Sequence, residues 1–277
     1  IMTDEQRWDC VGYAGHPLLN TPNYDRLAES GVAFERCYSA NPVCMPARCS
    51  IHTGLYSFQT GQMDNRGDWP LNFPTFTQAL QDLGYYCRLT GKLHAHEAIG
   101  GEVADLTQSP WIDDIHHLGF DDACQAGGKG MGFFAEDDYT RHLHEQGLLQ
   151  TYREDLVLRS EGKRDGIAPS PLPEEDYIDN FIGNRAAGWL AEYDGEEPFF
   201  HMVSFCSPHP PHDAYESARD KIDESRIELP VEGEKNHTSI TPENWLRARA
   251  AYLADINIVD ENIGKVLDVL EERGWLE

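Results

Sequence analysis

The distribution of apolar residues predicts long buried elements in the second half of the chain. A segment that starts at Thr241-Pro242 has apolar side chains three, four and seven residues apart, which predicts a helix with one buried stripe. Residues 178–193 also have the character of a helix, and residues 198–205 form a nearly continuous apolar run that predicts a buried strand. The stripe of the last helix consists of Trp245, Tyr252, Ile256, Val259, Ile263, Val266 and Leu270.

Helix and strand signals alternate in the first half as well. Residues 21–31 combine a capping threonine, a first-turn proline and a closing glycine, which predicts a short helix, and residues 74–84 predict a second one. Residues 32–40 and 85–90 predict the strands that follow these helices. Residues 105–173 are rich in Asp, Gly and Pro, and we expect irregular structure there.

This alternation predicts an α/β fold with a largely parallel central sheet and helices on both faces. The chain opens on residues 1–4, typical of the end of a buried strand, and closes on residues 274–277, where a further strand is expected. We therefore expect residues 1–277 to form one incomplete domain with an irregular insertion at about 105–173. The glycine-rich residues 127–132 are interpreted as a turn over a cleft, because no strand precedes them as a dinucleotide fingerprint requires.

Composition excludes some partners. The chain has 48 acidic and 22 basic residues and a formal net charge of -26, whereas nucleic-acid binding needs a basic footprint, so no nucleic-acid partner is expected. No apolar run is long enough to span a membrane and no signal-peptide pattern is present, so neither a membrane partner nor a compartment is predicted. The 7 cysteines lack the spacing of a disulfide framework or a zinc site.

The most informative segment for chemistry is residues 44–54, with the frame Cys-x-Pro-x-Arg and a trailing Thr-Gly. Pro46 suits the first position of a helix, which would place Cys44 just before a helix N-terminus, where free N–H groups favour a bound anion. Arg48, one turn further on, can bind an oxyanion or a neighbouring carboxylate. The alternative interpretation is that Cys44 is a small buried apolar residue, as we expect for Cys49.

Polar side chains follow the predicted strands at several points. Asp4, the Cys44 loop, Lys92 with His94, and His209 each come after a predicted strand. In parallel sheets, ligands gather at the carboxyl ends of the strands. We therefore expect these residues to form one site at that edge.

Several segments of the chain, taken in their order along the sequence, resemble the sulfatases of the alkaline-phosphatase superfamily. The opening Asp-x-Gln and Asn65 resemble the choline-sulfatase and phosphonate-monoester-hydrolase branch more than the arylsulfatases, whose opening carries two adjacent aspartates. Glu5 stands at the second of those positions, so whether Glu5 binds metal is left open. The resemblance runs over nearly the whole chain, rests on residues 3–9, 15–16, 21–27, 44–54, 91–94 and 207–211, and implies an alkaline-phosphatase-like fold.

The resemblance also implies a cofactor and a modified nucleophile. Asp4 would bind a divalent cation, with Ca²⁺ preferred and Mn²⁺ or Mg²⁺ as alternatives. Cys44 would be oxidised by a formylglycine-generating enzyme to formylglycine, whose hydrate would lie on that metal and attack sulfur. The remaining metal ligands would come from a strand after the long helix, beyond Glu277.

Four further residues receive catalytic roles from the resemblance. Arg48 and Lys92 would neutralise the sulfate oxygens and the nucleophile. His94 would take a proton from the second hydroxyl of the hydrate, and His209 would contact the leaving-group oxygen. The alternative for each histidine is an ordinary polar residue whose hydrogen bonds are satisfied by the fold, and for Lys92 a solvated lysine.

Two residues are candidates for substrate binding. His212 lies close to His209 in sequence, and Asn65 follows the nucleophile segment, although asparagine before Arg66-Gly67 is equally a turn former. The expected substrate is a small-molecule sulfate ester. A phosphonate or phosphate ester hydrolase on the same site and a non-catalytic sulfatase-like protein remain as alternatives, and neither the alcohol nor the oligomeric state is predicted.

Overall fold

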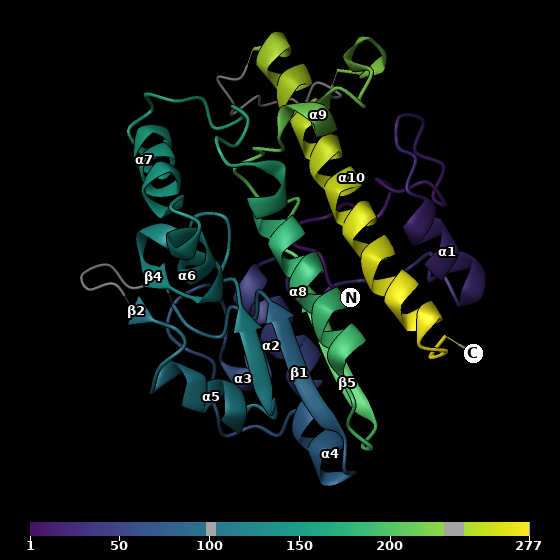
Figure 1. The fold of residues 1–277 in the computed structure, drawn as a ribbon, viewed down its shortest axis with the longest axis vertical. Coiled ribbons are helices and arrows are strands. Elements are labelled where there is room, and N and C mark those ends of the chain that lie inside the picture. The colour runs from purple at the N-terminus through teal and green to yellow at the C-terminus, as the bar shows by residue number, and fades with distance from the viewer. Residues whose placement is uncertain (98–103, 230–240, 277) are drawn as a thin grey trace.

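A parallel three-stranded sheet forms the centre of the molecule (Figure 1). The computed structural model describes residues 1–97, 104–229 and 241–276. In the described part of the chain, β1 (Tyr86–Gly91) lies between β3 (Asp122–Gln125) and β5 (Phe199–Ser204), and Met2 adds a parallel bridge to Ser204. The strands predicted over residues 85–90 and 198–205 are therefore confirmed.

The register of the sheet brings the carboxyl ends of its strands together. Gly91 at the end of β1 pairs with Gln125 of β3 and with Ser204 of β5. The N–H of Lys92 still donates to the Ser204 carbonyl, at 3.0 Å. The segments that leave these three strands therefore start at one edge of the sheet.

Two long helices cover one face of the sheet (Figure 1). α8 (Ile178–Glu192) and α10 (Pro242–Glu272) lie side by side and bury apolar side chains against Val203 of β5 and Phe205, most of the stripe predicted for α10 among them. Both helices confirm the sequence pattern. α1 (Pro22–Ser30) packs on the outer side of α10, where the Asn23 side chain donates to Asp260.

The opposite face of the sheet carries shorter helices. α2 (Cys44–Thr53), α4 (Phe76–Asp82) and α5 (Trp111–His117) bury apolar side chains against Cys87 and Leu89 of β1. A capping box opens α4: the N–H of Gln78 donates to Thr75, and the Gln78 side chain accepts from the N–H of Thr75. The α/β architecture with helices on both faces is thus confirmed.

The strand expected over residues 32–40 is wrong. None of these residues pairs with a strand in the described part of the chain, and Val32, Phe34 and Tyr38 are 78%, 79% and 84% exposed. A strand requires a neighbouring backbone to satisfy its hydrogen bonds, and periodicity along one segment does not supply that neighbour.

The irregular structure expected over residues 105–173 is also wrong. β3 joins the central sheet, and the polar residues that suggested loops serve as helix caps: Asp137 accepts the N–H of Thr140 at 2.7 Å. β4 (Ala135–Glu136) pairs with β2 (Ala104–Asp105) in a small second sheet. The other elements are α3 (Ser57–Thr60), η1 (Met131–Phe133), α6 (Asp138–Glu145), α7 (Leu149–Ser160), η2 (Glu174–Asp176), α9 (Glu216–Arg219) and η3 (Glu224–Arg226).

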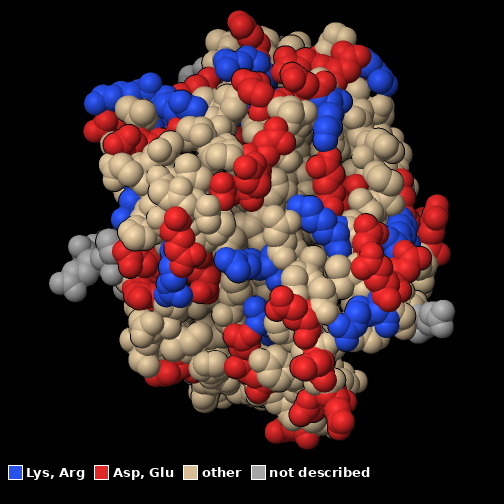
Figure 2. Space-filling view, viewed as in Figure 1, with Lys and Arg blue, Asp and Glu red and all other residues tan. Residues whose placement is uncertain are grey.

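Acidic side chains are spread over the face seen in Figure 2, with Lys and Arg side chains between them. This agrees with the formal net charge of -26 as a property of the solvated surface. Among the described residues, no helix combines the length and the apolar character that crossing a bilayer requires.

Candidate active site

Residues from four separate segments meet at the carboxyl edge of the sheet. Asp4, Cys44 and His209 each offer one ligand atom, and these three atoms all lie within 4.8 Å of one another. Lys92 leaves the end of β1 and reaches Asp4. An open cleft of about 500 Å³ lies over this group, lined in part by Gln6, Asn41, Ala47 and Ile51.

Asp4 is the electrostatic centre of the group. It is 5% exposed, and its Oδ2 lies 2.5 Å from Lys92 Nζ and 3.7 Å from Arg48 Nη2. Burial alone would raise the pKa of Asp4, but the charges of Lys92 and Arg48 outweigh burial, so this pKa lies below its ordinary value. Asp4 is therefore ionised at neutral pH.

Cys44 is the first residue of α2, rather than a residue just ahead of it as the position of Pro46 suggested. The first N–H bonded within the helix is that of Ala47, which donates to Val43 at 2.9 Å, so Pro46 at the third position removes no helical bond. The Cys44 thiol lies 3.6 Å from Oδ1 of Asp4. Burial, and then Asp4, raise the pKa of this thiol.

Arg48 and Lys92 connect α2 to the sheet. Arg48 is 3% exposed, and its Nη1 donates to the Lys92 carbonyl at 2.5 Å and to Ser204 Oγ at 3.0 Å. Of the two uses expected for Arg48, the structure contains the contact with a carboxylate, that of Asp4. Ser204 was missed from the sequence, where the only signal was a polar residue at the end of an apolar run.

His94 has a left-handed backbone, with φ of 61°, a conformation that non-glycine residues adopt rarely and often at functional sites. Its Nδ1 is buried and has no hydrogen-bond partner in the described residues. Burial, with a contribution from Lys92, lowers the pKa of His94 to about 3. The imidazole is therefore neutral at neutral pH. It also lines a second cavity of about 240 Å³ with Trp111 and Phe134.

His209 faces the group from the segment that follows β5. Its Nδ1 lies 2.6 Å from the Pro210 carbonyl, which can only accept, so Nδ1 carries the proton. Nε2 is left to face Asp4 and lies 3.4 Å from Oε1 of Glu5. Burial and then Lys92 lower the pKa of His209.

The two candidates for substrate binding occupy different surroundings. Asn65 is exposed, and its Oδ1 accepts the N–H of Met45 at 2.9 Å, so it caps the first turn of α2. His212 lies against Asp255 of α10, with Nδ1 3.6 Å from Oδ2. Neither residue lines the cleft over Cys44 among the described residues, and their binding of substrate stays a prediction.

Asp4 and Cys44, with His209 beside them, fit part of the shell of a divalent cation. The ionised carboxylate of Asp4 is a ligand that oxygen-preferring cations favour, and the Cys44 sulfur lies beside it. Replacement of that sulfur by oxygen would give the cation a second oxygen ligand. Elsewhere in the described residues, no other cluster of three His, Cys, Asp or Glu side chains has this spacing. A cation would take further ligands from outside this set.

The amino-acid sequence is similar to a family model and to proteins of known name. The family model described as Sulfatase matches residues 1–277. The chain is 27% identical to an arylsulfatase of Clostridium perfringens and 25% identical to a choline-sulfatase of Rhizobium meliloti, over 100% of its length in both cases. It spans 59% of the first protein and 54% of the second.

Solved structures show the same fold. A phosphonate monoester hydrolase of Silicibacter pomeroyi superposes with a TM-score of 0.79 at 21% identity, and covers 99% of this chain and 59% of its own. The corresponding enzyme of Agrobacterium radiobacter gives 0.73 at 24% identity, with the same shares of the two chains. Because the family model matches the whole chain, this protein belongs to the sulfatase family.

Proposed function

We propose that residues 1–277 are the N-terminal part of the catalytic domain of an enzyme that hydrolyses a sulfate monoester, with a nucleophile derived from Cys44. The observation that carries this proposal is the position of the Cys44 thiol, 3.6 Å from a buried, ionised Asp4 that Lys92 holds at 2.5 Å. Family membership and the resemblance to arylsulfatase and choline-sulfatase support the reaction class.

The raised pKa of Cys44 disfavours the unmodified thiol as the nucleophile. A thiol beside a carboxylate is poorly ionised at neutral pH, and the thiolate is the reactive form of cysteine. Oxidation by a formylglycine-generating enzyme replaces the thiol with an aldehyde, whose hydrate offers a hydroxyl oxygen for attack on sulfur. A hard divalent cation held by Asp4 and the hydrate, with Ca²⁺ first among the candidates, would lower the pKa of that hydroxyl.

The remaining residues divide the reaction between them. Arg48 and Lys92 place positive charge where the sulfate oxygens would lie, in a buried setting where such charge counts most. Neutral His94 accepts the proton of the second hydroxyl when the sulfated enzyme breaks down. His209 directs Nε2 toward the group and would contact the oxygen on the leaving-group side.

Hydrolysis of a phosphonate or phosphate ester is the second candidate. The fold shared with two phosphonate monoester hydrolases and Glu5 in place of a second aspartate favour it. A dianionic phosphate needs more compensating charge than a monoanionic sulfate. Relative kcat/KM values for a matched pair of esters with the same alcohol separate the two candidates.

Mass spectrometry of the peptide that contains Cys44 tests the nucleophile directly. We expect a lower mass than that of the unmodified thiol peptide when the complete protein is made with a formylglycine-generating enzyme. Cys44→Ala should abolish hydrolysis of an activated aryl sulfate, whereas Cys49→Ala, the buried control on the same helix, should retain most of it. Substantial turnover by Cys44→Ala would refute the proposal.

A further inference from the structure

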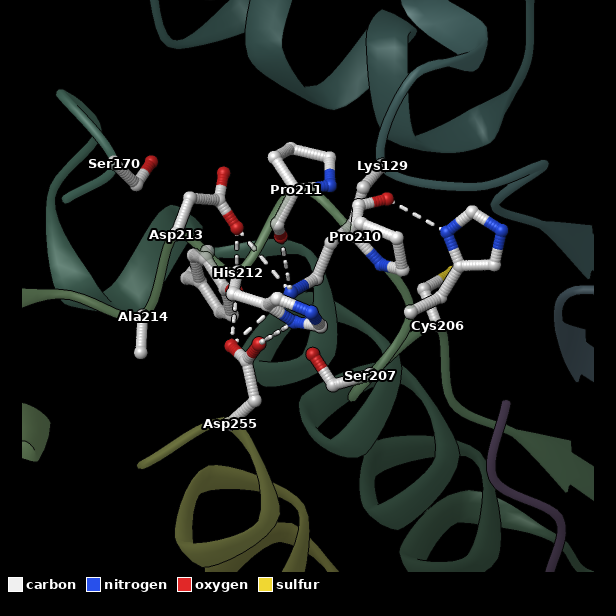
Figure 3. Close-up of polar contacts among 12 residues, drawn as sticks. Lys129, Ser170, Cys206, Ser207, Pro210, Pro211, His212, Asp213, Ala214 and Asp255 are labelled. Atoms are coloured by element: carbon white, nitrogen blue, oxygen red, sulfur yellow. Dashed lines mark hydrogen bonds and ion pairs between the residues drawn. The ribbon is translucent and has the colours of Figure 1, made fainter. Parts of the chain in front are cut away.

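Lys129 is a buried cation that the proposed reaction does not use. It lies in the glycine-rich segment 127–132 and is 4% exposed. Figure 3 shows its ammonium group between Pro211, Asp213 and Asp255. Nζ lies 3.1 Å from the Pro211 carbonyl, 3.2 Å from Asp213 Oδ1 and 3.0 Å from Asp255 Oδ1, so each of its three N–H groups has an acceptor.

The two carboxylates around Lys129 come from different parts of the fold. Asp255 is fully buried on α10, and Asp213 ends the segment that carries His209. The hydroxyl of Tyr177, at the start of α8, lies 2.9 Å from an oxygen of each carboxylate. Two buried carboxylates that share one hydroxyl and one ammonium group repel one another unless a cation lies between them. The positive charge of Lys129 therefore holds Asp213 against α10.

The segment that presents His209 is thereby anchored at both ends. At its start, Asp179 of α8 accepts the N–H groups of Cys206 at 2.8 Å and Ser207 at 3.1 Å. At its end, Lys129 binds the carbonyl of Pro211 and the side chain of Asp213.

The imidazole of His209 lies between these anchors. Its Nδ1 donates to the carbonyl of Pro210, which directly precedes the carbonyl that Lys129 binds. A displacement of Pro211 therefore moves the acceptor that orients the ring.

We propose that Lys129 is a positioning residue of the active site: its ammonium fixes residues 210–213 and thereby sets where His209 meets the leaving group. The inference rests on the proposed function, in which His209 contacts the leaving-group oxygen. It also accounts for a lysine at this position, because three acceptors converge on one nitrogen, whereas the planar fork of arginine spreads its donors apart.

A double-mutant cycle in the complete protein tests the inference. Lys129→Met, His209→Ala and the double variant are assayed on sulfate esters with graded leaving groups. We expect Lys129→Met to lower kcat/KM about 10- to 100-fold for poor leaving groups and only about threefold for good ones, because a misplaced His209 no longer stabilises the leaving-group oxygen. The double variant should be no slower than His209→Ala alone, because Lys129 acts through His209.

Arg88→Met is the matched control. Arg88 is a largely buried cation paired with Asp122, and it lies on β1 three residues before the carboxyl end of the strand. Its loss should slow all esters equally and add to the effect of His209→Ala. Hydrogen exchange, measured by mass spectrometry without any substrate, should be faster in peptides from residues 205–215 of Lys129→Met and unchanged there in Arg88→Met.

The outcomes separate this inference from the proposed function. Equal losses for all leaving groups in Lys129→Met, or losses that add to those of His209→Ala, overturn the positioning role alone. If His209→Ala itself slows all esters equally, the role of His209 falls and the inference falls with it. Should Lys129→Met not fold, the triple variant Lys129→Met, Asp213→Asn and Asp255→Asn decides by the same criteria. It removes the lysine together with both carboxylates, so no unpaired charge remains buried.

Discussion

The ammonium nitrogen of Lys92 lies 2.5 Å from Oδ2 of Asp4, and the two side chains are 5% and 6% exposed. Lys92 directly follows β1 and Asp4 follows the bridge at Met2, 88 positions apart in sequence. Their contact keeps a buried carboxylate ionised at the point where the Cys44 side chain arrives. The charge of the site is therefore set before any substrate binds.

Lys92→Met should lower kcat/KM at least about 100-fold, the cost of about 3 kcal/mol that follows loss of one preorganised electrostatic contact. Steady-state kinetics on an aryl sulfate provide the measurement. The control is Lys221→Met, because Lys221 pairs with Glu261 at the same distance of 2.5 Å but both side chains are about half exposed. A surface pair contributes little, so the control should be nearly silent. A loss of less than threefold in Lys92→Met would remove Lys92 from the catalytic set.

His94→Ala should accumulate sulfated enzyme. Attack on sulfur can proceed without His94, whereas breakdown of the covalent adduct needs a base at the second hydroxyl. Intact-mass spectrometry after mixing with substrate would detect the added sulfate. His96→Ala is the control two residues along, since His96 is also largely buried but lies near Asp68 and Asp114. If His96→Ala traps the adduct and His94→Ala does not, the two roles have been assigned to the wrong imidazole.

Asn65→Ala should destabilise the protein by about 1 kcal/mol, because it removes the acceptor for the N–H of Met45 in the first turn of α2. Asn65→Asp keeps an acceptor and should retain the stability. Urea denaturation measures both variants, and KM values for a sulfate ester are compared alongside. Unchanged stability with a raised KM in Asn65→Ala would show that Asn65 binds substrate and does not cap the helix.

Stability should fall with pH below about 6.5 because of His52, a buried imidazole between Trp69 and Phe76. Burial, and then Arg48, lower the pKa of His52 to about 4. Between about pH 6.5 and pH 4, the unfolded chain therefore binds a proton at His52 that the folded protein does not bind. The contribution of neutral His52 to the free energy of unfolding is complete above the unfolded pKa and is lost as pH falls toward 4.

The loss is on the order of 3 kcal/mol between these limits. Urea midpoints at pH 7 and pH 4.5 are compared for wild type and His52→Phe, in which this contribution is absent. Identical pH dependence in the two proteins would exclude His52 as its source.

The amino-acid sequence determined the elements with a clear period and the identity of the site. Apolar spacing predicted α8 and α10, and prolines and glycines predicted the ends of α1 and α4, because these signals act within a few residues. The Cys-x-Pro-x-Arg frame and the polar residues after each strand predicted that Asp4, Cys44, Lys92 and His209 would meet. This prediction follows from the parallel topology, because the carboxyl ends of parallel strands lie at one edge of the sheet.

Only the tertiary structure decided the rest, because the deciding partners lie far away in sequence. Residues 32–40 have the apolar content of a strand but no neighbouring backbone in the described chain, and β3 becomes a strand through its pairing with β1. Arg48 pairs with the carboxylate of Asp4, which lies 44 positions before it in the sequence. Lys129 finds its acceptors 82 and 126 residues away. Such buried charges are stable only where the fold brings their partners together, which no local pattern reveals.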